Sequence, residues 1–250
     1  MTLLDLVGGS FAYGGGKTVL QGIDLSIRAG SNLGIVGESG SGKTTLLKLL
    51  LGLERVSAGT VSFRGQSLDT GNRNVMRSFR RSVQAVFQDP YSSLDPRQKV
   101  FDIIAEPLRS LKIETDIASA VAEALRDVDL PADAAGRYPH EFSGGQRQRI
   151  AIARAIVAKP AVIIADEVVS ALDLTTRTRI IDLMRTLSSR TTFVVVSHDI
   201  ALVALLCEQL VVLEKGLIVE KGPTRELLAR PVHPYTQRLL ASMPRMPQTV

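Results

Sequence analysis

The chain has 250 residues, of which 45% are hydrophobic and 22% are charged, so we predict a compact globular protein with one large domain or two smaller lobes. Its 30 Lys and Arg against 25 Asp and Glu give a net charge of +5, too small an excess to decide between nucleic acid and an anionic membrane face as a partner. Aromatic residues make up only 4%, which argues against a surface on which bases stack.

The first half of the chain alternates strand and helix patterns before a helical stretch. Residues 19–27 and 31–37 form two short apolar strand patterns separated by the turn Arg28-Ala29-Gly30. A dense apolar helix is predicted from Thr44 to near Gly52, and residues 59–65 alternate as a strand does. Residues 100–140 hold Ala- and Leu-rich helical patterns and no strand signal, which predicts a helical insertion.

The second half returns to alternation. We predict a helix over 144–158, a buried strand over 161–165, a helix over about 175–187, a buried strand over 191–199, another helix and a strand pair over 209–222. Strands alternating with helices predict a parallel α/β sheet.

The placement of the chain in the cell is predicted from what its sequence lacks. The single cysteine, Cys207, excludes an internal disulfide and favours a reducing compartment. The first residues lack the basic start and apolar run of a signal peptide, and no apolar stretch reaches the roughly 18 residues needed to cross a bilayer. We therefore expect a soluble, cytoplasmic chain unless a partner holds it at a membrane.

The segment GESGSGKT, from Gly37 to Thr44, matches the P-loop pattern G-x4-G-K-[ST] and lies between a predicted strand and a predicted helix. Backbone N–H groups at a helix N-terminus can encircle phosphate oxygens, Lys43 can neutralise the β- and γ-phosphates, and the Thr44 hydroxyl can ligate magnesium. We therefore predict ATP and Mg²⁺ as cofactors. The residues predicted to hold them here are Gly37, Ser39, Gly40, Ser41, Gly42, Lys43, Thr44 and Thr45.

The strand that ends at Ala165 runs into Asp166 and Glu167, which predicts two carboxylates at the C-terminal edge of the sheet beside the phosphate site. Asp166 suits a magnesium contact, and Glu167 suits a general base that orients the attacking water. An Asp-Glu pair alone is commonly structural, but joined to a P-loop it predicts a catalytic pair. Kinases, GTPases, helicases and transport motors share the P-loop, so other segments must show what ATP is used for.

A second anion-binding arrangement, Ser143-Gly144-Gly145-Gln146, opens the predicted helix upstream of the Asp-Glu pair. Together with Gln88, Ser170-Ala171-Leu172-Asp173 and His198, it resembles the ATP-binding cassette (ABC) family, whose motif order essentially the whole chain follows. The resemblance implies a single nucleotide-binding domain over 1–250, an α/β fold with a P-loop NTPase core, an antiparallel β subdomain and a helical signature-motif subdomain. The core with its β lobe would comprise 1–88 and 159–250, and the helical subdomain 89–158.

The resemblance also implies roles for single residues. Ser143 and Gly145 of one subunit would cap the γ-phosphate held by the loop of another in a head-to-tail dimer, with Asp173 at the interface. Tyr13 would stack on adenine, and His198 would sense the γ-phosphate. The implied catalytic set is Lys43, Gln88, Glu167 and His198; the metal set is Thr44, Gln88 and Asp166; and the nucleotide contacts include Tyr13, Gln88, Asp166, Ser143, Gly144, Gly145 and Gln146.

Each of these residues taken singly has a plain structural interpretation as well. Gln88 could be a polar loop residue, His198 a turn former at a strand end, and Tyr13 a strand aromatic. The signature motif, Ser143 to Gln146, is preceded by Phe142 where Leu is common in the wider family, and Val168 stands where Pro is frequent after the Asp-Glu pair. Neither departure removes a predicted phosphate, metal or water contact.

Three segments resemble the peptide and nickel importer branch of the family, namely FQDPYSSLDPR over 87–97, YPHEF over 138–142 and HPYT over 233–236. The branch implies a second ATPase subunit, usually a different chain, two membrane permeases fed by an extracytoplasmic substrate-binding protein, and a peripheral position on the cytoplasmic face of the inner membrane. Residues 88–108 would receive the permeases' coupling helices. The chain ends at Val250 without the Cys-bearing tail of many peptide-importer ATPases, which favours the short nickel or metal-chelate type.

Two other classes of function compete with transport. The basic charge would suit a cassette ATPase that acts on DNA or ribosomes. DNA-repair cassettes separate the two motifs by a long coiled coil, whereas Thr44 and Ser143 are only 99 residues apart. Ribosomal members carry two cassettes per chain. The Ser143 motif, Gln88 and His198 count against a small-molecule kinase. The branch motifs favour import over export and no nucleic-acid partner, and the cargo stays open because it would not touch this subunit.

Overall fold

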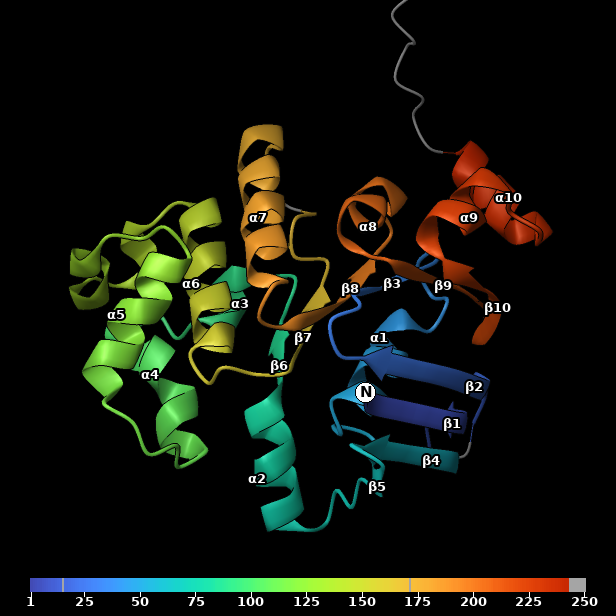
Figure 1. Cartoon of the computed structure of the whole chain (residues 1–250), viewed down its shortest axis with the longest axis horizontal. Coiled ribbons are helices and arrows are strands. Elements are labelled where there is room, and N and C mark those ends of the chain that lie inside the picture. Colours follow the sequence, from blue (N-terminus) through green and yellow to red (C-terminus); the bar gives the residue numbers. More distant parts are fainter. Residues whose placement is uncertain (15, 171, 243–250) are drawn as a thin grey trace, which may run out of the picture.

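Two β-sheets organise the fold, and the structure, a computed structural model, describes residues 1–14, 16–170 and 172–242 (Figure 1). The smaller sheet is antiparallel and has the order β2-β1-β4-β5. Its strands are β1 (Thr2–Ala12), β2 (Thr18–Arg28), β4 (Ala58–Phe63) and β5 (Gln66–Ser67). Alternate β2 residues from Ile23 to Ile27 are buried, as expected for a sheet with one face against a core.

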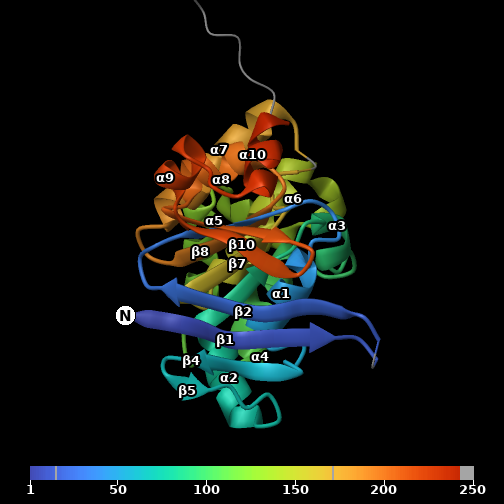
Figure 2. The same ribbon diagram turned by 90° about the vertical axis from the view of Figure 1, so that its right-hand side faces the viewer.

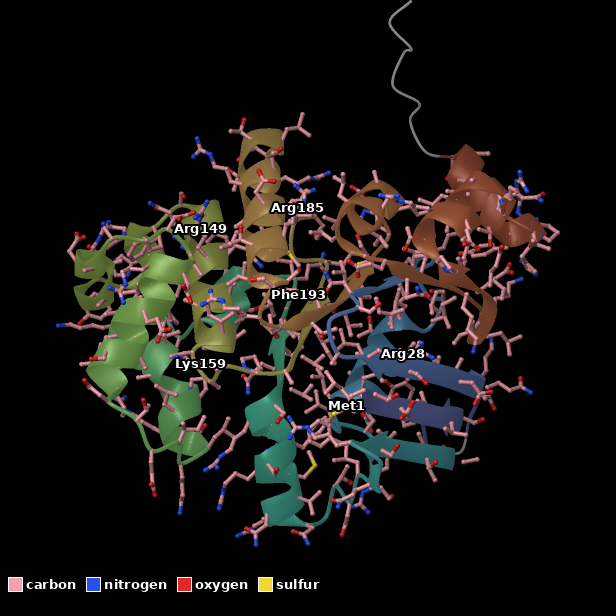
Figure 3. The ribbon with its side chains drawn as sticks, viewed as in Figure 1. Met1, Arg28, Arg149, Lys159, Arg185 and Phe193 are labelled. Carbon is pink, nitrogen blue, oxygen red and sulfur yellow. The ribbon has the colours of Figure 1, made fainter. Side chains whose placement is uncertain are left out.

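The larger sheet has the order β10-β9-β3-β8-β7-β6, and it is parallel except for β10, which pairs antiparallel with β9. Its strands are β3 (Leu33–Val36), β6 (Val83–Val86), β7 (Val162–Asp166), β8 (Thr192–Ser197), β9 (Gln209–Glu214) and β10 (Leu217–Pro223). Every residue of β3 and β8 is buried, because both faces of the sheet are covered. Figure 3 shows Phe193 of β8 in the interior of the molecule.

Helix α1 (Lys43–Leu50) lies between the two sheets (Figure 2). Its leucines share one buried cluster with Leu4 and Leu6 of β1 and with Ile35 of β3. This packing fixes the start of α1, and therefore the P-loop, against the end of β3.

A second buried cluster joins the other face of the large sheet to the remaining helices. Helices α7 (Leu174–Leu187) and α8 (Ile200–Leu206) cover that face, and α9 (Thr224–Ala229) and α10 (Pro234–Ala241) follow β10. Helices α4 (Val100–Ser110), α5 (Ile117–Asp127) and α6 (Gly144–Ile156) gather at one end of the molecule, with α3 (Pro90–Ser93) and the 3-10 segments Ala132–Gly136 and Pro139–Glu141 (Figure 1).

The sequence patterns did not predict several of these elements, among them α9 and α10. Strand β1 was not identified, and neither were α2 (Arg73–Ser82) and the following β6. Helix α2 carries four arginines and buries only Met76 and Phe79, so its apolar stripe is too sparse to signal a helix. Among the described helices, none is long and apolar enough to cross a membrane.

Candidate active site

The P-loop connects β3 to α1 as predicted. Gly40 and Gly42 adopt φ values of +79° and +109°, a region that glycine enters without the steric cost of a side chain. Gly37 has no room for a side chain, since a Cβ there would lie 2.2 Å from the carbonyl oxygen of Leu213. The N–H of Leu46 donates to the Gly42 carbonyl at 2.9 Å, so α1 starts at the end of the loop and its free N–H groups lie there.

Lys43 lies at the centre of the candidate site. Its ammonium donates to the carbonyl oxygens of Gly37 at 2.6 Å and Glu38 at 2.9 Å. Burial lowers the pKa of Lys43, and the carboxylates of Glu167 and Asp166 partly oppose that shift. The Lys43 cation and the two predicted carboxylates therefore share one site. Of the two threonines that follow, Thr44 is exposed and Thr45 is buried.

Asp166 is the last residue of β7 and is partly buried. Burial is the largest cause that raises the pKa of Asp166; the neighbouring charge of Glu167 adds to it, and Lys43 opposes it. Asp166 therefore binds a proton more readily than an exposed aspartate does, and a nearby cation would favour its charged form.

Glu167 is held by the next strand. Its N–H donates to the Val196 carbonyl at 2.9 Å, and its Oε1 accepts the backbone N–H of His198 at 3.0 Å and lies 2.8 Å from His198 Nδ1. Its Oε2 is buried and has no hydrogen-bond partner among the described residues. Glu167 also has a φ of +50°, which is uncommon for a residue with a side chain and is concentrated at functional sites.

Gln88 follows β6, two residues after the strand ends, and is exposed. Its Nε2 lies 3.4 Å from the Ser170 hydroxyl, which in turn donates to the Glu167 carbonyl at 2.9 Å. Lys43, His198, Glu167 and Gln88 thus follow β3, β8, β7 and β6, four neighbouring strands of the sheet. The structure therefore brings together the residues predicted as the catalytic set.

Tyr13 lies just beyond β1 and beside α1. Its hydroxyl is 3.4 Å from Thr45 Oγ1, and its ring meets Phe11 edge to face. Tyr13 is 45% exposed, and the Lys48 ammonium lies 5.7 Å from the centre of its ring. An exposed aromatic face is therefore available next to the helix that carries the P-loop.

The signature motif forms the start of α6. The Ser143 hydroxyl accepts the Gln146 N–H at 3.4 Å, and Gln146 Oε1 accepts the Ser143 N–H at 2.9 Å, a reciprocal capping box. Gly144 has open space around it, whereas Gly145 packs against Thr176 of α7.

Ser143, Gly145 and Gln146 line a cavity of about 610 Å³ together with residues of α6 and α7, among them Arg149 and Arg179. Within the described ranges, no P-loop residue lines this cavity. Among the described residues, the signature motif therefore does not share this cavity with the P-loop. Asp173 caps α7 by accepting the Thr176 N–H at 3.0 Å, and Ala171 beside it lies outside the described residues.

Two contacts to the P-loop were missed by the sequence analysis. The Tyr235 hydroxyl in α10 accepts the Glu38 N–H at 2.9 Å, and the Gly216 N–H in the β9–β10 turn donates to the Ser41 carbonyl at 2.8 Å. Tyr235 belongs to the HPYT segment, whose sequence resembles a branch of the family and gives no sign of a contact with the site. No local pattern could have revealed a contact over such a separation in sequence.

The chain matches two family models. Residues 20–170 match "ABC transporter", and residues 219–249 match "Oligopeptide/dipeptide transporter, C-terminal region". The last residues of the second match, from 243, lie outside the part that the structure describes.

Two curated relatives are similar over most of this chain. It is 47% identical over 228 residues to the peptidoglycan transport ATP-binding protein YejF of Agrobacterium fabrum, covering 89% of this chain and 42% of the relative. It is 46% identical over 229 residues to the glutathione import ATP-binding protein GsiA of Escherichia coli strain K12, covering 90% of this chain and 37% of the relative. The chain thus spans about two fifths of the length of these relatives.

Solved structures confirm the predicted fold class. The cbiO1 subunit of a cbiONQ ABC transporter complex from Clostridium perfringens is 27% identical, with a TM-score of 0.82 and 91% of each chain covered. A dimeric post-hydrolysis state of the ATP-binding cassette MJ0796 with ADP and Pi is 28% identical, with a TM-score of 0.78, covering 89% of this chain and 99% of that one. The predicted resemblance is confirmed as well: the C-terminal match is to the oligopeptide/dipeptide transporter region, and the chain belongs to the ABC transporter family.

Proposed function

We propose that the chain binds and hydrolyses ATP with Mg²⁺ and powers a membrane importer of the oligopeptide, dipeptide or nickel type. The observation that carries this proposal is the meeting of Lys43, Asp166 and Glu167 at the carboxyl end of the sheet, where each influences the charge of another. A cation beside paired carboxylates at a P-loop is suited to phosphoryl transfer, in which catalysis is largely positioning and charge stabilisation.

The residues present fit a magnesium ion. Thr44 offers an exposed hydroxyl, Gln88 an exposed amide, and Asp166 a carboxylate whose raised pKa a divalent cation would reverse, and oxygen ligands are those that Mg²⁺ prefers. We assign these three side chains to the ion, which when bound would neutralise charge on the β- and γ-phosphates.

The remaining roles follow from the positions of the side chains. Lys43 and the loop N–H groups would bind the phosphates, and Tyr13 would stack on adenine. Glu167 would orient and deprotonate the attacking water through Oε2, while His198 holds Oε1 and would respond to the γ-phosphate. These assignments rest on the hydrogen bonds around Glu167 and on the exposed Tyr13 ring.

The signature motif would complete the site of a partner subunit. Ser143, Gly144, Gly145 and Gln146 lie apart from the P-loop of their own chain, which supports the head-to-tail dimer with Asp173 at the interface. We propose residues 89–158 as the helical subdomain and 1–88 with 159–250 as the core. ATP would close such a dimer because both faces contact it, and hydrolysis would let it reopen.

The partners and cargo are the least constrained part of the proposal. The proposed partners are two permeases, a second ATPase subunit and an extracytoplasmic substrate-binding protein. They would place the chain on the cytoplasmic face of the inner membrane. We propose no nucleic-acid partner. The C-terminal match and the glutathione and peptidoglycan named for the relatives favour a peptide-like cargo. Nickel or a metal chelate stays the alternative prediction.

The test is the Glu167→Gln variant. Because glutamine keeps the shape but accepts no proton, we expect ATP to bind with wild-type affinity while turnover falls by about 10² to 10⁴, the loss typical of a positioned base. Turnover would be measured by phosphate release, and binding by a fluorescent ATP analogue.

The matched control is Glu114→Gln, which makes the same chemical change at an exposed residue between α4 and α5 and should leave turnover unaltered. Wild-type turnover in Glu167→Gln would remove this residue from its role. Absence of ATP binding by the wild-type protein would overturn the proposal.

A further inference from the structure

The HPYT segment reaches the P-loop through one buried side chain. Tyr235 is 3% exposed, and its hydroxyl accepts the backbone N–H of Glu38 although the two residues are 197 positions apart. Burial raises the pKa of Tyr235, so the hydroxyl stays neutral at physiological pH. Glu38 is the second residue of the P-loop, so this contact joins the C-terminal region directly to the loop.

The hydrogen bond from Glu38 to Tyr235 and the hydrogen bond from Lys43 to Gly37 involve the same peptide group. The Glu38 N–H and the Gly37 carbonyl belong to one peptide group, and the Gly37 carbonyl accepts the Lys43 ammonium at 2.6 Å. Because a trans peptide is planar, its N–H and its C=O point in opposite directions. Tyr235 therefore fixes one side of this peptide and Lys43 the other, and a rotation of the peptide would break both bonds.

The backbone of Tyr235 is held independently of Glu38. The Glu220 carboxylate in β10 accepts the N–H of Val232 at 2.9 Å and that of His233 at 3.1 Å. His233 Nδ1 then accepts the Tyr235 N–H at 3.2 Å and caps α10. A group whose own backbone is held in this way can position another precisely.

We propose that Tyr235 is a positioning residue of the nucleotide site, which sets the orientation of the Gly37–Glu38 peptide and through it the place of the Lys43 ammonium. This inference rests on the proposed function, because it takes the P-loop as the ATP site. It gives the C-terminal region a part in nucleotide binding, although Tyr235 itself does not touch the nucleotide.

The Tyr235→Phe variant tests the proposal in the full chain. Phenylalanine keeps the buried ring and removes only the acceptor of the Glu38 N–H. We expect ATP affinity, measured with a fluorescent analogue, to fall by about three- to tenfold, the range for one lost hydrogen bond. The KM for ATP should rise by the same factor with kcat nearly unchanged, and amides of the 37–42 segment should exchange hydrogen faster in the nucleotide-free protein.

The matched control is Tyr138→Phe, which removes a phenolic hydroxyl from the segment before the signature motif and should change none of these quantities. A second variant, Glu220→Ala, loosens the support of α10 without altering the Tyr235 ring and should weaken ATP binding in the same direction. Wild-type affinity and wild-type exchange of 37–42 in Tyr235→Phe would overturn the inference while leaving the ATPase proposal intact. Failure of the wild-type protein itself to bind ATP would instead overturn the proposed function.

Discussion

At the scale of single residues, the candidate site contains groups whose conformation or burial is energetically unfavourable in the folded state. Glu167 has a positive φ, an arrangement that costs on the order of 1 to 3 kcal/mol and persists only where the surroundings enforce it. Lys43 and Asp166 are both shifted by burial toward their neutral forms. Charged groups that are incompletely compensated in the free protein are suited to a ligand that carries the missing charges.

The raised pKa of Asp166 makes a prediction about stability. The folded state binds this proton more strongly than the unfolded state does, so the free energy of unfolding falls as pH rises from the unfolded-state pKa through the raised folded-state pKa. At neutral pH the ionised carboxylate is therefore destabilising. Asp166→Asn should raise the melting temperature of the nucleotide-free protein. The rise should be about 2 to 4 °C for each kcal/mol added to the free energy of unfolding.

Thermal melts at pH 7 and at successively lower pH would measure this effect, and the gain should shrink as the wild-type carboxylate becomes protonated. Asp182→Asn is the control, because Asp182 is 62% exposed and its pair with Arg185 contributes little. A lower melting temperature for Asp166→Asn at pH 7 would contradict the electrostatic account of the site.

At the scale of elements, α6 connects the signature motif to its surroundings. The Arg147 guanidinium lies 4.1 Å from the centre of the Tyr91 ring, and Arg154 donates to the Ser93 carbonyl. Both contacts join α6 to α3, the short helix that follows Gln88. The segment proposed to receive the permeases therefore packs directly on the helix that begins with the signature motif.

The contact between α6 and α7 makes a second prediction. A Cβ on Gly145 would lie 2.3 Å from the methyl group of Thr176, whereas a Cβ on Gly144 would meet nothing within 4 Å. Gly145→Ala should therefore push the two helices apart and lower the melting temperature, with a loss of about 1 to 3 kcal/mol, the usual range for overpacking. Calorimetry would measure the change.

Gly144→Ala is the matched control and should leave the melting temperature unchanged or slightly higher, since alanine favours helix over glycine. The double variant Gly145→Ala/Thr176→Ser removes the clashing methyl group and should restore most of the lost stability. Equal melting temperatures for Gly144→Ala and Gly145→Ala would show that the close approach of α6 to α7 does not restrict the side chain at position 145.

At the scale of the whole molecule, one chain carries a P-loop before α1 and a signature motif at the start of α6. If the tagged chain is purified from detergent-solubilised native membranes, we expect two permeases and a second ATPase subunit to co-purify, with the substrate-binding protein indicating the cargo. Mass spectrometry would identify them. The Lys43→Ala variant, purified in parallel, is the control for assembly that depends on nucleotide binding. Recovery of ribosomes or DNA in place of permeases would reject the transport function.

The sequence by itself determined the family and the fold class, and it predicted the residues of the candidate site. The P-loop, the Asp166-Glu167 pair and the signature motif each consist of consecutive residues. Each motif can therefore be recognised from the local sequence alone. Most helices and the buried strands also followed from local periodicity. Strand β1, helix α2 and strand β6 did not, because the sheet partners and sparse buried contacts that stabilise them are supplied by distant parts of the chain.

Only the tertiary structure decided which distant residues meet. The order of the large sheet sets β8 beside β7, which brings His198 to Glu167, and it sets β9 beside β3, which brings the C-terminal region to the P-loop. The Tyr235 contact with Glu38 and the packing of Gly145 on Thr176 depend on that order in the same way. Such contacts are fixed by strand pairing and helix packing over long separations, and no local propensity or motif encodes them.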